Sequence, residues 1–129
     1  MGCDPALEEA FSASWDYVVA SYTEWGAAGP ESASHICRRL LELISELRDA
    51  GYDRTLRAGQ SVSTFIVSRS RAHGMQQDQP SIALYPRDDR VLVTPSWLPD
   101  RKRDALAIGY ECDPRLIELL DELVSRPIT

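Results

Sequence analysis

The sequence is poor in the residues that mark metal, redox and phosphate-binding sites. It contains three cysteines, two histidines and seven glycines in 129 residues. Cys3, Cys37 and Cys112 form no C-x-x-C pair, and three cysteines cannot all pair within one chain, so a reducing compartment is the simplest setting. Neither G-x-x-x-x-G-K nor G-x-G-x-x-G occurs. We therefore expect no metal site and no cofactor, and we expect Cys37 to be a small buried hydrophobe.

The sequence also lacks the motifs of nucleophilic and general acid–base catalysis. No G-x-S-x-G elbow surrounds a serine, and neither His35 nor His73 stands in a motif that supplies a nucleophile and an orienting group. Adjacent carboxylates such as Asp88 and Asp89 are typical of solvated turns, because a glycosidase pair must converge from different elements. These absences favour a non-enzymatic protein, and an enzyme whose site assembles from distant loops is the alternative.

Long apolar runs are absent as well, so neither a secretory signal nor a membrane span is predicted. We expect a soluble, cytoplasmic protein that does not engage membranes. The apolar content is nevertheless ordinary at 43%, and three tryptophans and five tyrosines supply large packing groups. This composition excludes wholesale disorder and predicts a chain that forms a hydrophobic core.

Negative charge dominates the composition, with a formal net charge of -6 and a pI near 4.8. This balance argues against a constitutive nucleic-acid binder, which would show a basic excess. The charge is unevenly divided, because residues 1–52 carry nine acids and three bases, residues 53–103 five acids and nine bases, and the remainder six acids and two bases. The basic residues of the middle block either offset acidic helices within one fold or form a local anion-binding face.

Hydrophobic periodicity predicts two helices at the start of the chain. The first begins at Asp4 and Pro5, ends at Gly26 and has apolar residues three or four positions apart: Leu7, Phe11, Trp15, Val18, Tyr22 and Trp25. The second ends before Gly51 and has its own stripe: Ile36, Leu40, Leu43, Ile44 and Leu47. The connection between the helices is short and contains Gly and Pro, so we expect an antiparallel helical hairpin.

The segment from Gln60 to Gly74 fits two structures. Val62, Phe65 and Ile66 have helical spacing, whereas residues 64–67 are the kind that strands favour. Helix is the preferred interpretation, and a central strand with both faces covered is the alternative.

The rest of the chain predicts an antiparallel meander and a closing helix. Strands are expected at 81–85, 91–94 and 106–110, and the helix begins at Asp113 and Pro114 and ends before Pro127. The predicted fold class is α+β, because helices and strands are segregated along the chain. We expect one domain over residues 1–129, with an N-terminal antiparallel helical hairpin, a small antiparallel β-meander of three to four strands, and a C-terminal helix packed on one face of the sheet.

The strongest candidate for a functional surface is the segment from Pro95 to Arg103. It places Trp97 and Leu98 between two prolines, followed by three consecutive bases: Arg101, Lys102 and Arg103. Trp and Arg are enriched at interface hot spots, and proline stiffens a loop. The alternative is that the Trp and Leu close the core while the basic run stays hydrated. If this is a contact surface, further arginines of the middle block should join it: Arg69, Arg71, Arg87 and Arg90.

These features predict a non-enzymatic protein that binds a protein partner, such as an inhibitor, an immunity-like protein or an adaptor. A nucleic-acid or anion binder is the second interpretation, because Trp97 stacked on a base would suit a single strand. That interpretation requires the arginines to gather on one surface. The oligomeric state and the identity of the partner are not predicted by any pattern in the sequence.

Overall fold

The computed structural model describes residues 4–71, 79–97 and 105–128. Its elements follow in the order α1 (Pro5–Ala28), α2 (Glu31–Asp49), α3 (Tyr52–Thr55), β1 (Arg57–Ser61), β2 (Thr64–Ser68), β3 (Ser81–Pro86), β4 (Val91–Pro95), β5 (Leu106–Ile108) and α4 (Pro114–Val124). The strands form one antiparallel sheet in which each strand pairs with its neighbour in sequence. The predicted α+β class is confirmed.

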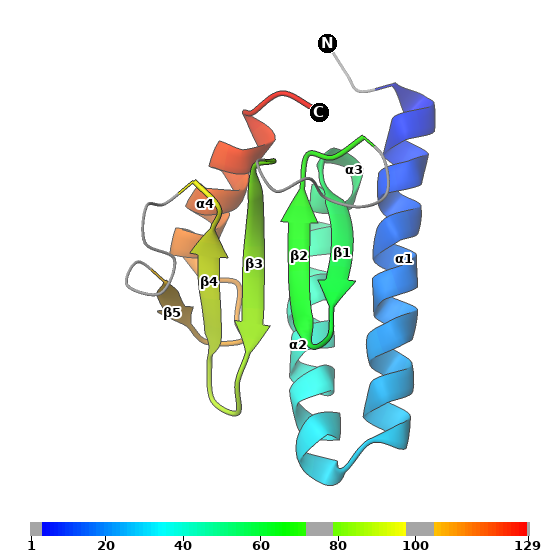
Figure 1. The fold of residues 1–129 in the computed structure, drawn as a ribbon, viewed down its shortest axis with the longest axis vertical. Coiled ribbons are helices and arrows are strands. Elements are labelled where there is room, and N and C mark those ends of the chain that lie inside the picture. The colour runs from blue at the N-terminus through cyan, green and yellow to red at the C-terminus, as the bar shows by residue number, and fades with distance from the viewer. Residues whose placement is uncertain (1–3, 72–78, 98–104, 129) are drawn as a thin grey trace.

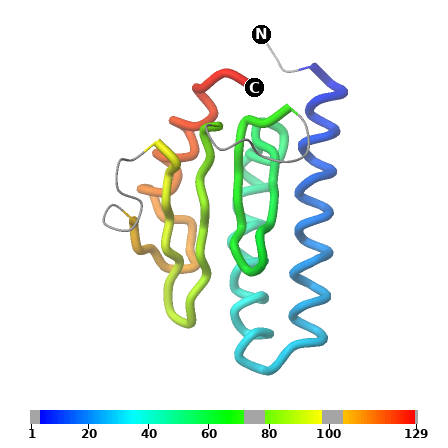
Figure 2. The backbone as a smooth tube through the Cα atoms, in the orientation of Figure 1, coloured from blue at the N-terminus to red at the C-terminus, as the bar shows by residue number. Residues whose placement is uncertain are grey.

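The helices are arranged around one side and one edge of this sheet. Figure 1 shows α2 and α4 behind the sheet and α1 alongside β1, with α1 and β1 running in the same direction. The first two helices pack against each other in opposite directions, which is the predicted helical hairpin (Figure 2). Within the described ranges, none of the helices is both long and apolar enough to cross a membrane.

The core lies between the helices and the sheet face that they cover. Alternate residues of the central strands are fully buried on this face: Phe65, Val67, Ile82, Leu84, Val91 and Val93. The alternation follows from the two-residue period of a strand, which sends successive side chains to opposite faces. On the other face several apolar side chains remain partly exposed: Ile66, Ala83, Tyr85 and Leu92. The outer face of the sheet is therefore without a covering helix in the described part of the chain.

The predicted helix starts are confirmed by their caps. The Asp4 carboxylate accepts the N–H of Ala6 at 3.0 Å, and the Asp113 carboxylate accepts the N–H of Arg115 at 2.8 Å. At its other end α1 continues past the predicted stop at Gly26 to Ala28. The helix ends at Ala28 because Pro30 disfavours helical geometry at the residue before it, and the chain is extended at Gly29.

The preference for a helix between Gln60 and Gly74 is wrong. Residues 57–61 and 64–68 form the antiparallel strands β1 and β2, so the sheet has five strands rather than three to four. A two-residue turn joins them, and Val62 in this turn has a φ of 55°. Such hairpin turns normally carry Gly, Asn or Asp, because these residues tolerate positive φ. The hairpin escaped sequence reasoning because Val62 and Ser63 carry no turn signal.

The apolar stripe predicted for α1 is buried except at its last member. Five of its residues lie in the core or beside it: Leu7, Phe11, Trp15, Val18 and Tyr22. Trp25 is 41% exposed, so the stripe is not buried at its last residue. Tyr22 already reaches Ser63 at the turn of the β1–β2 hairpin, and Trp25 lies almost one helical turn beyond it. The helix therefore extends past the hairpin that would have covered the indole.

Candidate functional site

A groove runs between α1 and the β1–β2 hairpin. One wall is a stripe on α1, and the rest comes from the edge and outer face of the hairpin. The groove is lined by Ser14, Tyr17, Val18, Ser21, Trp25, Arg57, Ala58, Gly59, Gln60, Ser61, Val62, Ile66 and Ser68. Its volume is about 530 Å³, which is within the range of ligand-binding clefts. We call these residues the α1–hairpin groove.

The groove is open because much of its lining has short side chains. Gly59 is the clearest case, since a Cβ there would meet only the carbonyl oxygen of Ile66, at 3.9 Å. Its backbone does not have the positive φ that favours glycine. The fold therefore has room for a side chain at position 59, and the space that this side chain would fill is part of the groove.

Three hydrogen bonds hold α1 against the β1–β2 hairpin and Leu56, the residue just before it. The Trp15 indole Nε1 donates to the carbonyl of Leu56 at 2.8 Å, and the N–H of Ala58 donates to the Ser14 hydroxyl at 2.9 Å. The Tyr22 hydroxyl donates to the carbonyl of Ser63 at 3.1 Å. Because these bonds are spread along the helix, both walls of the groove belong to one rigid frame.

Large apolar side chains remain exposed in this groove. Among the described residues, Tyr17 is 74% exposed, Trp25 is 41% exposed and Val62 is 79% exposed, and all three line the groove. Val62 also has a positive φ, which no other non-glycine residue of the described ranges has, and this backbone state is costly for a β-branched side chain. The chain therefore holds an exposed valine in a strained turn at the edge of the groove.

Arg57 lies in the same groove and is 8% exposed. Its Nε donates to the carbonyl of Ser70 at 2.9 Å, one Nη donates to the carbonyl of Arg71 at 2.7 Å, and its guanidinium lies 5.3 Å from the centre of the Phe11 ring. Burial lowers the pKa of Arg57 from its usual value. None of the carboxylates in the described ranges forms an ion pair with it.

The predicted Trp97 surface is only partly within the described chain. Leu98, Arg101, Lys102 and Arg103 lie outside the described residues, so their role stays a prediction. Trp97 is half-buried, packs against the core, and has the Arg126 guanidinium 4.3 Å from the centre of its ring. The Trp97 indole is therefore neither fully buried nor fully exposed to solvent.

The four other predicted arginines fall into two groups. Arg69 donates to the carbonyls of Arg126 and Thr55. Because Arg126 also contacts Trp97, Arg69 lies near Trp97, at the end of the sheet where β2 and β4 finish. Arg71 follows Arg69 closely in sequence and is exposed. Arg87 and Arg90 lie in the turn between β3 and β4, at the opposite end of that hairpin (Figure 1). The described arginines therefore do not gather on one surface. We call Arg69, Arg71, Trp97 and Arg126 together the Trp97 end.

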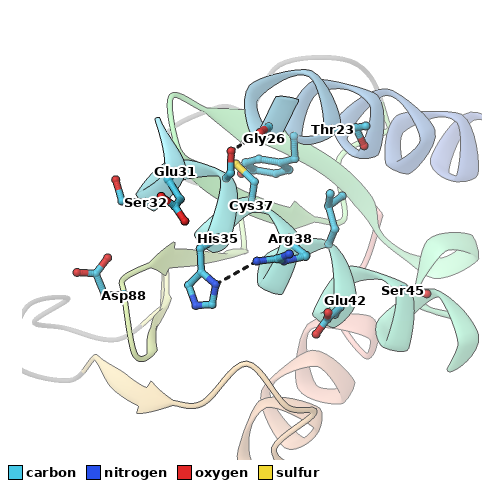
Figure 3. Close-up of a pocket in the computed structure, with 13 residues that line it drawn as sticks. Thr23, Gly26, Glu31, Ser32, His35, Cys37, Arg38, Glu42, Ser45 and Asp88 are labelled. Carbon is cyan, nitrogen blue, oxygen red and sulfur yellow. Dashed lines mark hydrogen bonds between the residues drawn. The ribbon is translucent and has the colours of Figure 1, made fainter. Parts of the chain in front are cut away.

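A second, more open concavity of about 1180 Å³ lies along α1 and α2 and reaches Asp88 (Figure 3). His35 contacts Arg38 there, with Nδ1 and Nη2 3.4 Å apart, whereas the Cys37 side chain is directed toward Gly26 of α1 (Figure 3). Burial raises the pKa of the Cys37 thiol, which keeps it protonated. The described residues here bring no base to a nucleophile, and no group of three or more metal-ligating side chains occurs among them.

Comparison with known protein families, with curated proteins and with solved structures finds no match to this chain. Its function therefore has to be argued from its own surfaces. Sequence reasoning missed the α1–hairpin groove, although a signal for it exists. Ser14, Tyr17, Ser21 and Trp25 recur three or four positions apart beside the core stripe, which places a second, mixed face on α1.

Proposed function

We propose that this chain is a non-enzymatic partner-binding protein and that the α1–hairpin groove holds an extended, apolar segment of a partner protein. The observation that carries the proposal is that the large hydrophobic side chains left exposed in the described chain, Tyr17, Trp25 and Val62, all line this one groove. Contiguous exposed apolar groups are a mark of binding surfaces, because burying them drives association. Trp and Tyr are also the residues most often found at interface hot spots.

The strained turn supports the same interpretation. A glycine at position 62 would adopt the observed φ without the cost that valine bears there. Strained backbone persists where the side chain has a use beyond folding. Contact between Val62 and a partner gives the residue such a use, since its side chain is 79% exposed and therefore contributes little to the core.

The dimensions and polar groups of the groove suit an extended peptide. The α1 wall rises about 16 Å from Ser14 to Trp25 at 1.5 Å per residue, and residues 57–62 span about the same length at 3.3 Å per residue. About five extended residues would therefore fill the groove. Ser21 and Ser61 line the groove, and their hydroxyls can form hydrogen bonds with the backbone of a bound peptide. These bonds would satisfy peptide groups that lose their contact with water on binding.

The charge of the groove restricts the partner further. The chain has a net charge of -6, yet neither Asp nor Glu lines the α1–hairpin groove, whose charged member is Arg57. An apolar segment that is neutral or acidic therefore meets no like charge in the groove, whereas a basic segment would face this guanidinium. The partner segment expected here is extended, apolar and not basic.

Selection of displayed random peptides tests the proposal. Wild-type protein is compared with Ser21→Trp, in which an indole fills the groove, and with Ala20→Trp, which places the same side chain at an exposed position of α1 outside the groove. We expect apolar peptides that bind wild type and Ala20→Trp equally and lose roughly 30-fold or more in affinity for Ser21→Trp.

Three results would overturn the proposal. The first is that no peptide is enriched on the wild-type protein. The second is that the selected peptides bind Ser21→Trp as tightly as Ala20→Trp while both variants keep the wild-type circular dichroism spectrum. The third is a dimer of wild-type protein in sedimentation that Ser21→Trp abolishes, because the groove would then hold a second copy of this chain.

A further inference from the structure

Arg57 differs from the other described arginines in its depth of burial. Arg48 lies 2.9 Å from Asp16 and 3.3 Å from Asp53. Three more arginines pair with acids close in sequence: Arg90, Arg115 and Arg126. Arg57 is more deeply buried than any other arginine of the described residues, at 8% exposed, yet its hydrogen-bond acceptors are backbone carbonyls. The most deeply buried arginine of these ranges therefore forms no ion pair with an acid of the described chain.

A buried guanidinium without a counter-charge is costly, because carbonyl dipoles replace only part of its hydration. Two of the donor groups of Arg57, Nε and one Nη, are engaged by the carbonyls of Ser70 and Arg71. The other Nη of Arg57 has no hydrogen-bond acceptor among the described residues. Arg57 lines the α1–hairpin groove beside the hydroxyl-bearing residues Ser14 and Ser68. The Ser14 hydroxyl already donates to the carbonyl of Phe11, so a carboxylate entering this end of the groove would pair with the guanidinium rather than with that hydroxyl.

We propose that the segment bound in the α1–hairpin groove carries a carboxylate that pairs with Arg57. The inference rests on the proposed function, and it adds the chemistry of the partner: an apolar anchor at the Tyr17, Trp25 and Val62 side, and an acidic group at the Arg57 side. The buried guanidinium gains the charge-assisted hydrogen bond that the described fold does not give it. A neutral segment of the same shape would leave this charge uncompensated.

Two matched small probes test this step on the unmodified protein. Naphthylacetate and naphthylacetamide have the same aromatic body and differ in whether the polar end is a carboxylate or a neutral amide. We expect the carboxylate to bind wild-type protein roughly ten-fold or more tightly in a fluorescence titration, as for the gain of a hydrogen bond between charged groups. Equal affinity of the two probes would overturn the inference.

Variants of Arg57 locate the effect. Arg57→Gln should remove the preference for naphthylacetate, and Arg57→Lys should retain part of it, because the ammonium keeps the charge but not the planar geometry. Arg54→Gln is the matched control, since Arg54 is exposed and does not line the groove. A preference that persists in Arg57→Gln would contradict the assignment. If Arg57→Gln does not fold, the two probes on wild-type protein remain decisive.

The peptide selection separates failure of this inference from failure of the proposed function. Peptides enriched on wild-type protein should carry Asp or Glu at a fixed distance from an apolar residue, and replacing that acid by its amide should weaken binding roughly ten-fold or more. Groove-dependent peptides without an acid would overturn the inference and leave the proposed function standing. If no groove-dependent peptide is found, both fail.

Discussion

The α1–hairpin groove and the Trp97 end contain similar residue types but differ in what those residues already contact. At the Trp97 end the Arg126 guanidinium covers one face of the indole, and Arg69 is bonded to the carbonyls of Thr55 and Arg126. In the groove, Tyr17 and Val62 remain mostly exposed. Arg57 donates to two carbonyls, as Arg69 does, and has no acid beside it in the described chain. Unmade polar contacts alone do not separate the two regions, because Arg126 Nε at the Trp97 end is buried without a hydrogen-bond partner. An interface is therefore better identified by the exposure of its large apolar side chains than by aromatic and basic composition.

The largest expected effect comes from removing the support beneath the groove. Trp15 is fully buried, donates to the carbonyl of Leu56 and packs edge-on against Phe65 with ring centres 5.3 Å apart. Trp15→Ala should lower the free energy of unfolding by about 3–5 kcal/mol, because it leaves a cavity and an unpaired carbonyl. Urea denaturation followed by circular dichroism measures this. A loss of less than about 1 kcal/mol would mean that Trp15 does not anchor α1 to the hairpin.

Much of this frame follows from sequence patterns, and the reason is periodicity. The stripes of α1, α2 and α4 and the alternation in β3 and β4 are long enough to identify each element. The β1–β2 hairpin is not predictable in this way, because the turn at Val62 violates the usual turn chemistry and β1 contains Arg57, Gly59 and Gln60 rather than strand-favouring residues.

The candidate site is harder to predict than the fold because it forms between elements distant in sequence. The exposed state of Trp25 depends on where the β1–β2 hairpin ends, and the isolation of Arg57 depends on which acids the fold brings near it. Neither is encoded in local spacing. The Trp97 segment stood out instead because its aromatic and basic residues are consecutive, a feature that says nothing about whether they are already engaged.

The strained turn provides a smaller effect with opposite signs for folding and binding. Val62→Gly should raise the free energy of unfolding by about 1 kcal/mol, because glycine adopts the φ of 55° without the steric cost. The same variant should bind the groove-selected peptides more weakly than wild type, since it removes an exposed apolar contact. Thermal unfolding and peptide titration of the same preparation measure the two quantities. Unchanged peptide affinity would remove Val62 from the contact surface.

The smallest effect is a pH dependence at the end of α1. Burial, with a smaller contribution from Cys37, raises the pKa of Tyr22 above its ordinary value of about 10. The stability that the neutral phenol contributes is therefore complete below about pH 10 and is lost as the pH rises toward the folded-state pKa. Between about pH 10 and 11, wild type should lose about 1 kcal/mol more stability than Tyr22→Phe in urea denaturation. Parallel losses in the two proteins would contradict this.

The affinity of one groove-selected peptide for three proteins tests the central claim most directly. The three are wild type, Trp25→Ser, which lacks the indole of the groove, and Trp97→Ser, which lacks the indole of the Trp97 end. We expect Trp25→Ser to bind the peptide roughly 30-fold more weakly than wild type, a loss of about 2 kcal/mol. The affinity of Trp97→Ser should stay within about two-fold of the wild-type value. The reverse order in a calorimetric titration of folded proteins would contradict the account and move the contact surface to the Trp97 end.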